Sequence, residues 1–258
     1  MQRTIDLNAD VGEERGDDRA LLALVSSANI ATGAHAGGGD VLVETVVAAI
    51  EAGCALGAHP SYPDREGFGR RRLPQLQAGQ ALTDTITEQV LLVAQQCAAF
   101  GSSLHHVKPH GALYNDAAED VRVAACVLAG VDHAARLLGL GPVPVVGLAG
   151  SLVGTLAKER GMPFIGEAFA DRAYDERGRL VPRSIAGSVL DSADEISQRV
   201  VDIAVNGRIR TVHGDVIHVS AQTICLHGDT PGAVANASTA REALEGAGID
   251  IARVTVLT

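Results

Sequence analysis

The chain has 258 residues, of which 47% are hydrophobic and 3% aromatic, and its formal net charge at pH 7 is −10. Its length suits one large α/β domain. The acidic balance and the lack of tryptophan disfavour a nucleic-acid partner, because such partners are held by basic patches and stacking aromatic rings.

The cysteines and the apolar runs bear on the compartment. The four cysteines are widely spaced with no CxxC pair, which favours reduced thiols in a cytoplasmic protein. Asp6 and Asp10 interrupt the first apolar run, so we expect no signal peptide. No segment reaches the roughly 18 apolar residues that span a membrane, so no membrane partner is expected.

Apolar runs of strand length alternate with helical patterns along the whole chain. The expected strands are 4–9, 29–32, 54–58, 105–108, 143–148, 163–166, 223–226 and 254–257. The expected helices are 17–25, 40–52, 81–100, 117–138, 151–160, 196–205 and 230–245, and their N-caps are Asp17 or Asp18, Asp40, Ser151 and Thr230. A loop excursion is expected over 174–183 and a hairpin over 210–219.

This alternation is typical of βαβ units and a mainly parallel sheet. We find no linker or internal repeat, so residues 1–258 are expected to form a single β/α barrel, irregular and seven-stranded. An open doubly wound sheet is the alternative.

Several apolar runs end on side chains suited to catalysis. These clusters span 5–10, 28–35, 54–64, 104–114 and 223–229. In β/α proteins substrates bind at the carboxyl ends of the strands, so we expect the clusters to converge on an active site.

The first cluster contains Asn8, Asp10 and Glu13. Asn8 and Asp10 are two residues apart on a strand and therefore point to the same face. Asp10 and Glu13 are suited to holding a divalent cation or to acting as a general base. A turn capped by Asp10 before Gly12 is an equally good interpretation of this cluster alone.

Two histidines occupy matching positions at strand ends. His35 and His59 each follow a Gly-Ala step. With Asp10 they form an Asp-His-His set suited to a metal ion, or to proton transfer without one. The compact HExxH motif is missing.

The loop after His59, up to residue 74, is stiffened by prolines and rich in charge. We expect it to cover the site, with Asp64 and Arg65 as binding residues. A solvated connection is the alternative.

Lys108 and His110 belong to the most specific string, Lys-Pro-His-Gly-Ala-Leu-Tyr-Asn. Lys108 offers a point charge for a phosphate or carboxylate, and His110 is a candidate for proton transfer.

Two further strand ends carry candidate binding residues. Asp171 and Arg172 follow the sixth strand, where a structural ion pair is the alternative. His227 and Asp229 end the 223–226 strand, beside the predicted start of the last helix.

These strings resemble the LamB/YcsF family, the family of A subunits of bacterial 5-oxoprolinase. The similar strings are 5–10, 26–31, 57–61, 63–65, 106–111, 169–172, 180–184 and 223–229, in family order. Two segments depart from the family pattern. Thr32 and Ala34 stand where relatives commonly have Cys and Phe, and Glu14, Arg15 and Gly16 replace small and aromatic residues.

The resemblance implies a barrel akin to the glycoside hydrolase/deacetylase superfamily and ATP-dependent opening of the 5-oxo-L-proline lactam to L-glutamate. It also implies partner subunits B and C. The co-substrate would be ATP with Mg²⁺, although no Walker A motif is present. We expect Lys108 to stabilise phosphate, Asp10 and Glu13 to bind Mg-ATP or activate water, and His59 or His110 to move protons. Arg172 would hold the substrate carboxylate.

Two alternatives from other functional classes stay open. One is a metal-dependent amide or sugar deacetylase that uses Asp10, His35 and His59 on one ion. The other is a binding subunit that delivers substrate to partners.

Overall fold

The computed structural model describes residues 3–73, 76, 78–228 and 232–255. Seven parallel strands form a closed barrel in the order β1-β2-β3-β4-β5-β6-β9, because β1 pairs with both β2 and β9. These strands are β1 (Arg3–Val11), β2 (Ser27–Ala31), β3 (Ala55–His59), β4 (His106–Val107), β5 (Val145–Leu148), β6 (Phe164–Phe169) and β9 (Thr223–Leu226). The predicted seven-stranded β/α barrel is confirmed, and closure excludes the open sheet.

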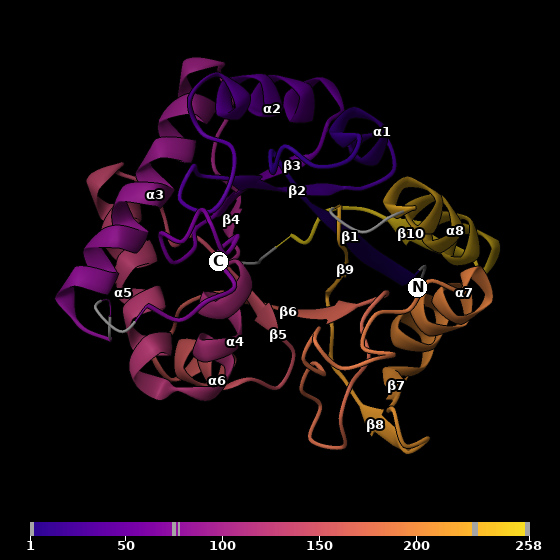
Figure 1. Ribbon diagram of the computed structural model, residues 1–258. Coiled ribbons are helices and arrows are strands. Elements are labelled where there is room, and N and C mark those ends of the chain that lie inside the picture. Colours follow the sequence, from indigo (N-terminus) through magenta and orange to yellow (C-terminus); the bar gives the residue numbers. More distant parts are fainter. Residues whose placement is uncertain (1–2, 74–75, 77, 229–231, 256–258) are drawn as a thin grey trace.

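The helices surround the strands as an outer ring (Figure 1). They are α1 (Asp18–Leu22), α2 (Gly39–Glu51), α3 (Gln80–Ala99), α4 (Gly111–Glu119), α5 (Val121–Leu137), α6 (Leu152–Glu159), α7 (Ala193–Val201) with its π-helical extension η1 (Asp202–Asn206), and α8 (Ala233–Gly246). The predicted hairpin is confirmed as β7 (Arg208–Arg210) and β8 (Val216–His218), which lie at the outer edge of the molecule. No helix among the described residues is long and apolar enough to cross a membrane.

Several predicted boundaries were wrong. The single helix expected over 117–138 is two helices, because Asp120 leaves the helical conformation and its carboxylate accepts the backbone N–H of Arg122 to cap α5. Gly38, not Asp40, is the N-cap of α2. The last strand is β10 (Ile249–Ile251), which pairs with β1 outside the ring, whereas Val254 and Thr255 form no strand. The predicted cap Thr230 lies outside the described residues.

The two faces of β1 show how the barrel is built. Leu7, Ala9 and Val11 are fully buried in the hydrophobic layer between strands and helices. Asp6 and Asn8 alternate with them and point into the barrel, where Asn8 donates to Glu167 and Thr223 across the interior. The interior of this barrel is therefore polar, and the main apolar core lies outside the strands.

The lower part of the interior, at the amino-terminal half of the strands, is a closed hydrogen-bonded network. Asp6 accepts hydrogen bonds from the hydroxyls of Ser26, Ser27 and Thr223 at 2.5–2.7 Å. His106 crosses the adjacent strand, and a Cβ on Gly57 would lie 2.1 Å from its Nε2 atom. Glycine at position 57 is thus required by the close approach of this imidazole ring.

Candidate active site

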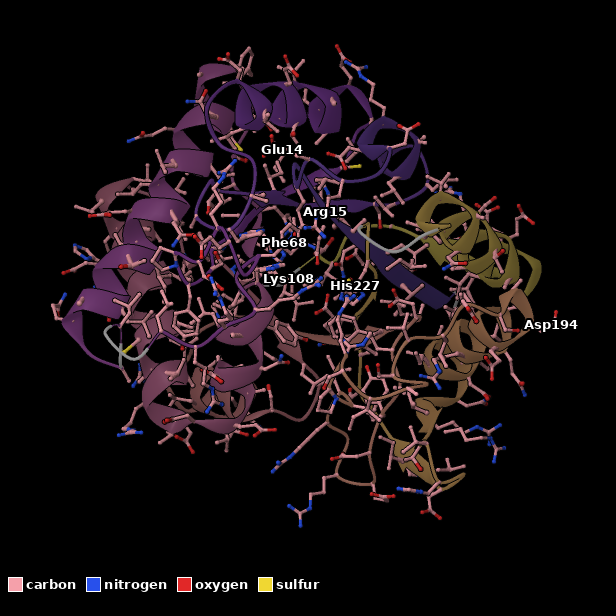
Figure 2. The ribbon with its side chains drawn as sticks, viewed as in Figure 1. Glu14, Arg15, Phe68, Lys108, Asp194 and His227 are labelled. Carbon is pink, nitrogen blue, oxygen red and sulfur yellow. The ribbon has the colours of Figure 1, made fainter. Side chains whose placement is uncertain are left out.

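A cavity of about 910 Å³ opens at the carboxyl ends of the strands. Asp10, Glu13, His59, Lys108 and His227, which come from four strand ends, line it together. In Figure 2, Lys108 and His227 lie near the barrel axis, whereas Asp194 of α7 lies at the outer edge. The predicted convergence of the strand-end clusters is therefore seen in the fold.

Lys108 is at the centre of the cavity floor. Its side chain is 2% exposed, and its Nζ atom lies 2.9 Å from both Asp10 Oδ1 and Glu167 Oε1. Nζ also donates to Asn8 Oδ1 at 3.1 Å and lies 3.0 Å from Cys225 Sγ. One ammonium group thus faces two carboxylates in a buried environment.

The electrostatics of this group keep it ionised. Burial alone would lower the pKa of Lys108, but Asp10, Cys225 and Glu167 outweigh it and hold this pKa well above its usual value. Burial alone would likewise raise the pKa of Asp10, but the charges of His59 and Lys108 hold it well below its usual value. The ammonium and the Asp10 carboxylate are therefore both charged at neutral pH.

A second group, which we call the histidine cluster, consists of Glu13, His35, His59 and His110. Glu13 Oε1 lies 3.1 Å from His35 Nε2, 3.3 Å from His110 Nδ1 and 3.9 Å from His59 Nε2. All four side chains are buried. Burial, and then the charge of His59, lowers the pKa of His35 to about 3, and burial also holds the pKa of His110 well below its usual value. Both rings are neutral at pH 7.

Asp10 contacts this cluster through one member. Its Oδ2 atom lies 3.3 Å from His59 Nε2, while its Oδ1 atom binds Lys108 and accepts from Asn29 at 2.8 Å. Glu13 and His110, rather than Asp10, complete the set of possible metal ligands around His35 and His59. The predicted Asp-His-His grouping is thus replaced by a Glu-His-His-His grouping.

Asp171 and His227 form a carboxylate–imidazole pair. Both carboxylate oxygens of Asp171 lie 3.0 Å from His227 Nδ1, and Phe169 stacks on the imidazole with ring centroids 5.1 Å apart. Burial raises the pKa of Asp171, but His227 outweighs it by charge and hydrogen bonding, so this pKa is lowered. The pair fixes which nitrogen of His227 faces the cavity, since Nδ1 is held by the carboxylate.

Arginines give the cavity a basic character. Those that line it are Arg70, Arg72, Arg172, Arg177, Arg179 and Arg183. Arg172 is buried, and its guanidinium donates to the carbonyls of Val181 and Ser188. Burial, with the neighbouring charge of Arg183, lowers the pKa of Arg172 to about 10. The carbonyl contacts hold this guanidinium at the cavity wall.

Other predicted site residues lie away from the cavity. Asn8 is buried in the barrel interior below Lys108, where it accepts from Nζ. Asp64 instead braces its own loop by accepting from Arg71 and from the backbone N–H of Gly67. Arg65 is exposed and ties this loop to Glu14 and to the carbonyls of Gly33 and Gly37. Asp229 lies outside the described residues.

Three residues of the site were missed from the sequence. Glu167 was placed beyond the end of its strand, but β6 continues to Phe169 and turns Glu167 into the barrel, where its side chain is fully buried. Cys225 was interpreted as a buried thiol in an apolar run, and Tyr114 belonged to the Lys108 string but was given no role of its own. Tyr114 lines the cavity, and burial together with the charge of Glu167 holds its pKa well above its usual value. A charged residue in an otherwise apolar strand was the available signal for Glu167.

A closed β/α barrel with ionisable side chains gathered at the carboxyl ends of its strands has the architecture of barrel enzymes. The chain belongs to the LamB/YcsF family, whose sequence profile it matches over residues 5–258.

Curated relatives and a solved structure support this assignment over nearly the full length. One of the 5-oxoprolinase A subunits of Agrobacterium fabrum is 44% identical over 96% of both chains. The 5-oxoprolinase A subunit of Streptomyces coelicolor is 45% identical over 96% of this chain and 98% of its own. The crystal structure of the lactam utilization protein from Thermus thermophilus superimposes with a TM-score of 0.89 at 36% identity, covering 97% of this chain and 100% of that one.

Proposed function

We propose that this chain is the A subunit of a cytoplasmic, ATP-dependent 5-oxoprolinase that works with B and C subunits. The complex would open the lactam of 5-oxo-L-proline to L-glutamate and hydrolyse ATP to ADP and phosphate. The names of the full-length relatives support the reaction. The observation that carries the role of this chain is the buried Lys108 between Asp10 and Glu167, on the floor of a cavity lined by arginines.

The chemistry explains why such a site is useful. A lactam carbonyl is a poor electrophile, so the proposed route transfers the γ-phosphoryl group of ATP to the lactam oxygen and releases ADP. Water then adds to the same carbon, the C–N bond opens, and a second water releases phosphate from the acyl phosphate. Each step places negative charge on oxygen, and a preorganised buried cation stabilises such charge more strongly than water does.

Lys108 would supply this cation. Its ammonium is fixed by two carboxylates and therefore requires little reorganisation when charge develops on the substrate. The co-substrate, ATP with Mg²⁺, would bring its phosphates to the arginine-lined part of the cavity, and Arg172 would face the substrate carboxylate.

Proton transfer belongs to two groups in this proposal. Asp10 is ionised and lines the cavity, so it is suited to accept a proton from water. His227, oriented by Asp171, is suited to protonate the departing lactam nitrogen, as in other carboxylate–imidazole pairs. We prefer His227 to His59 or His110 for this step, because their inward nitrogens face each other and Glu13.

The histidine cluster favours a second candidate, a hydrolase that cleaves amides on a metal ion without ATP. Three imidazoles and a carboxylate are an appropriate ligand set for such an ion. We rank it second because the curated relatives carry the 5-oxoprolinase name.

Reconstitution of the complex tests the proposal. The chain is co-purified with candidate B and C subunits, and glutamate release from 5-oxoproline is followed with and without ATP. We expect release only with ATP and all three subunits. Release by this chain alone, without ATP, would instead support the second candidate.

A matched pair of histidine variants tests the assignment of His227. His227→Gln should reduce glutamate release by about 10²-fold or more, the usual contribution of a general acid. His213→Gln alters an exposed histidine that contacts Glu176 but does not itself line the cavity, and it should leave the rate unchanged. Equal rates in both variants would remove His227 from the mechanism.

A further inference from the structure

The geometry of the histidine cluster points to a site for one divalent transition-metal ion, which we propose is bound by Glu13, His35, His59 and His110. The four ligand atoms would be Glu13 Oε1, His35 Nε2, His59 Nε2 and His110 Nδ1. They lie within 4.8 Å of one another, and all four residues are buried. This site does not depend on the proposed function.

The outward nitrogens of the three rings are already held by the protein. His59 Nδ1 donates to the carbonyl of Lys108 at 2.7 Å, and His110 Nε2 donates to the carbonyl of Phe68 at 2.9 Å. His35 Nδ1 lies 3.0 Å from Ser61 Oγ. Metal-bound histidines characteristically have their second nitrogen fixed in this way, which sets both tautomer and ring orientation.

These contacts leave a conflict that a cation resolves. A carbonyl only accepts hydrogen bonds, so the outward nitrogens of His59 and His110 each carry a proton. Their inward nitrogens lie 3.0 Å from each other, and that of His110 also faces the carboxylate oxygen Glu13 Oε1 at 3.3 Å. Lone pairs at this distance repel unless a metal ion or a proton lies between them.

The spacing suits a tetrahedral ion. Bonds of about 2.05 Å in tetrahedral geometry place ligand atoms about 3.3 Å apart. The separations within the histidine cluster include 3.0, 3.1, 3.3 and 3.9 Å. Imidazole and carboxylate ligands favour Zn²⁺ and its first-row neighbours, whereas Mg²⁺ prefers oxygen ligands alone. The stacked rings of His35 and His110, 3.8 Å apart, would separate when the ion binds.

The surrounding loop is built closely around the cluster. Phe68 has a left-handed backbone with a φ of 55°, which is costly for a residue with a side chain. Its ring packs edge-on against His35 and His110. The guanidinium carbon of Arg15 lies over the same ring, 4.1 Å from its centroid. Gly69 also has a positive φ, and a Cβ there would lie 2.8 Å from His110. The loop after β3 thus fixes the rings and shields them from solvent.

Metal uptake by the purified full-length chain is the test, and it is measured without substrate, ATP or partners. Chelator-stripped protein is titrated with Zn²⁺, Co²⁺ and Mg²⁺, and bound metal is counted by mass spectrometry. We expect one tightly held Zn²⁺ or Co²⁺ per chain, visible absorption typical of tetrahedral Co²⁺, and no competition from Mg²⁺. A wild-type protein that takes up neither ion would overturn the site and leave a shared proton as the resolution.

Variants locate the ion. Glu13→Gln and His110→Asn should each weaken binding by at least about 100-fold, since even changes behind the ligands cost about 10–100-fold. His213→Asn, at an exposed histidine, should bind as wild type does. Unchanged uptake in folded Glu13→Gln and His110→Asn, or its loss in His213→Asn, would show adventitious surface binding. Circular dichroism confirms folding, and His35→Gln replaces any variant that does not fold.

Discussion

Asp6 and Asp10 are four residues apart on the same face of β1, yet their surroundings shift their pKa values in opposite directions. Asp6 lies in the lower layer among the hydroxyls of Ser26, Ser27 and Thr223. Burial, only partly offset by these hydroxyls, raises its pKa. Asp10 lies in the upper layer beside Lys108 and His59, which lower its pKa, and it lines the cavity.

The difference shows that burial of a polar side chain is a poor guide to function. Both layers are buried and hydrogen-bonded, and the residue types in either layer would, taken alone, suggest a functional site. Of the two, the upper layer combines opposite charges and converging nitrogen atoms with access to the cavity of about 910 Å³, whereas the lower layer borders a pocket of only about 10 Å³. The lower layer links neighbouring strands by hydrogen bonds, and the upper layer is where we propose that the reaction takes place.

The largest expected effect is that of removing the charge of Lys108. Lys108→Met leaves Asp10 and Glu167 buried without their shared cation, so the free energy of unfolding should fall by about 3–5 kcal/mol. Glutamate release by the reconstituted complex should fall by about 10³-fold. Urea unfolding and the release assay measure the two effects separately.

The chain offers a matched control, since its only other lysine is the exposed Lys158 on α6. Lys158→Met should change neither stability nor rate appreciably. Full activity in a folded Lys108→Met variant would place the chemistry elsewhere.

A change in the lower layer should affect stability alone. Asp6→Ala removes the acceptor of three hydroxyl groups, and unsatisfied buried polar groups cost about 1–3 kcal/mol each. Because the hydroxyls can rotate to other acceptors, we expect a total loss of about 1–3 kcal/mol in the free energy of unfolding. A loss of turnover without a loss of stability in Asp6→Ala would contradict the assignment of a purely structural role to the lower layer.

The smallest effect is a pH dependence in the lower layer. Burial holds the pKa of His106 well below its usual value of 6.5, so the folded protein keeps this ring neutral. Its stabilising contribution is complete above pH 6.5 and is lost as the pH falls, because the unfolded chain then binds one proton more.

The measurement compares urea unfolding at several pH values between about 7.5 and 5.5 in wild type and His106→Asn. Below about pH 6.5, the free energy of unfolding of wild type should fall by up to about 1.4 kcal/mol more per pH unit than that of His106→Asn, since the unfolded wild type binds one proton more than the folded protein. Parallel pH profiles would mean that His106 is not held neutral.

The alternation of strands and helices in the sequence predicts the barrel, and the polar strand ends predict that Asp10, His59, Lys108 and His227 meet. What it does not predict is the pairing inside the barrel, because this depends on strand register. Ending the sixth strand at Gly166 hid Glu167, whereas the actual strand continues to Phe169 and directs Glu167 towards Lys108.

The loop after β3 shows a second limit. Asp64 and Arg65 have the composition of a binding loop, but both stabilise the loop itself. His110 was expected, as an alternative to His59, to transfer protons, and its contact with Glu13 follows from how this loop and β4 fold together. Residue type predicts which reactions a side chain can support. The tertiary contacts decide which side chains lie close enough to act together.

The same substitution at the two aspartates of β1 tests whether the upper layer, and not the lower layer, carries the proposed reaction. In the reconstituted complex, kcat/KM for ATP-dependent glutamate release is measured for Asp6→Asn and Asp10→Asn, with unfolding in urea as the check on folding. We expect a loss of about 10²-fold or more for Asp10→Asn. For Asp6→Asn we expect a loss of less than about threefold, with a change in stability only. Equal losses in the two folded variants, or a larger loss for Asp6→Asn, would contradict this assignment of the two layers.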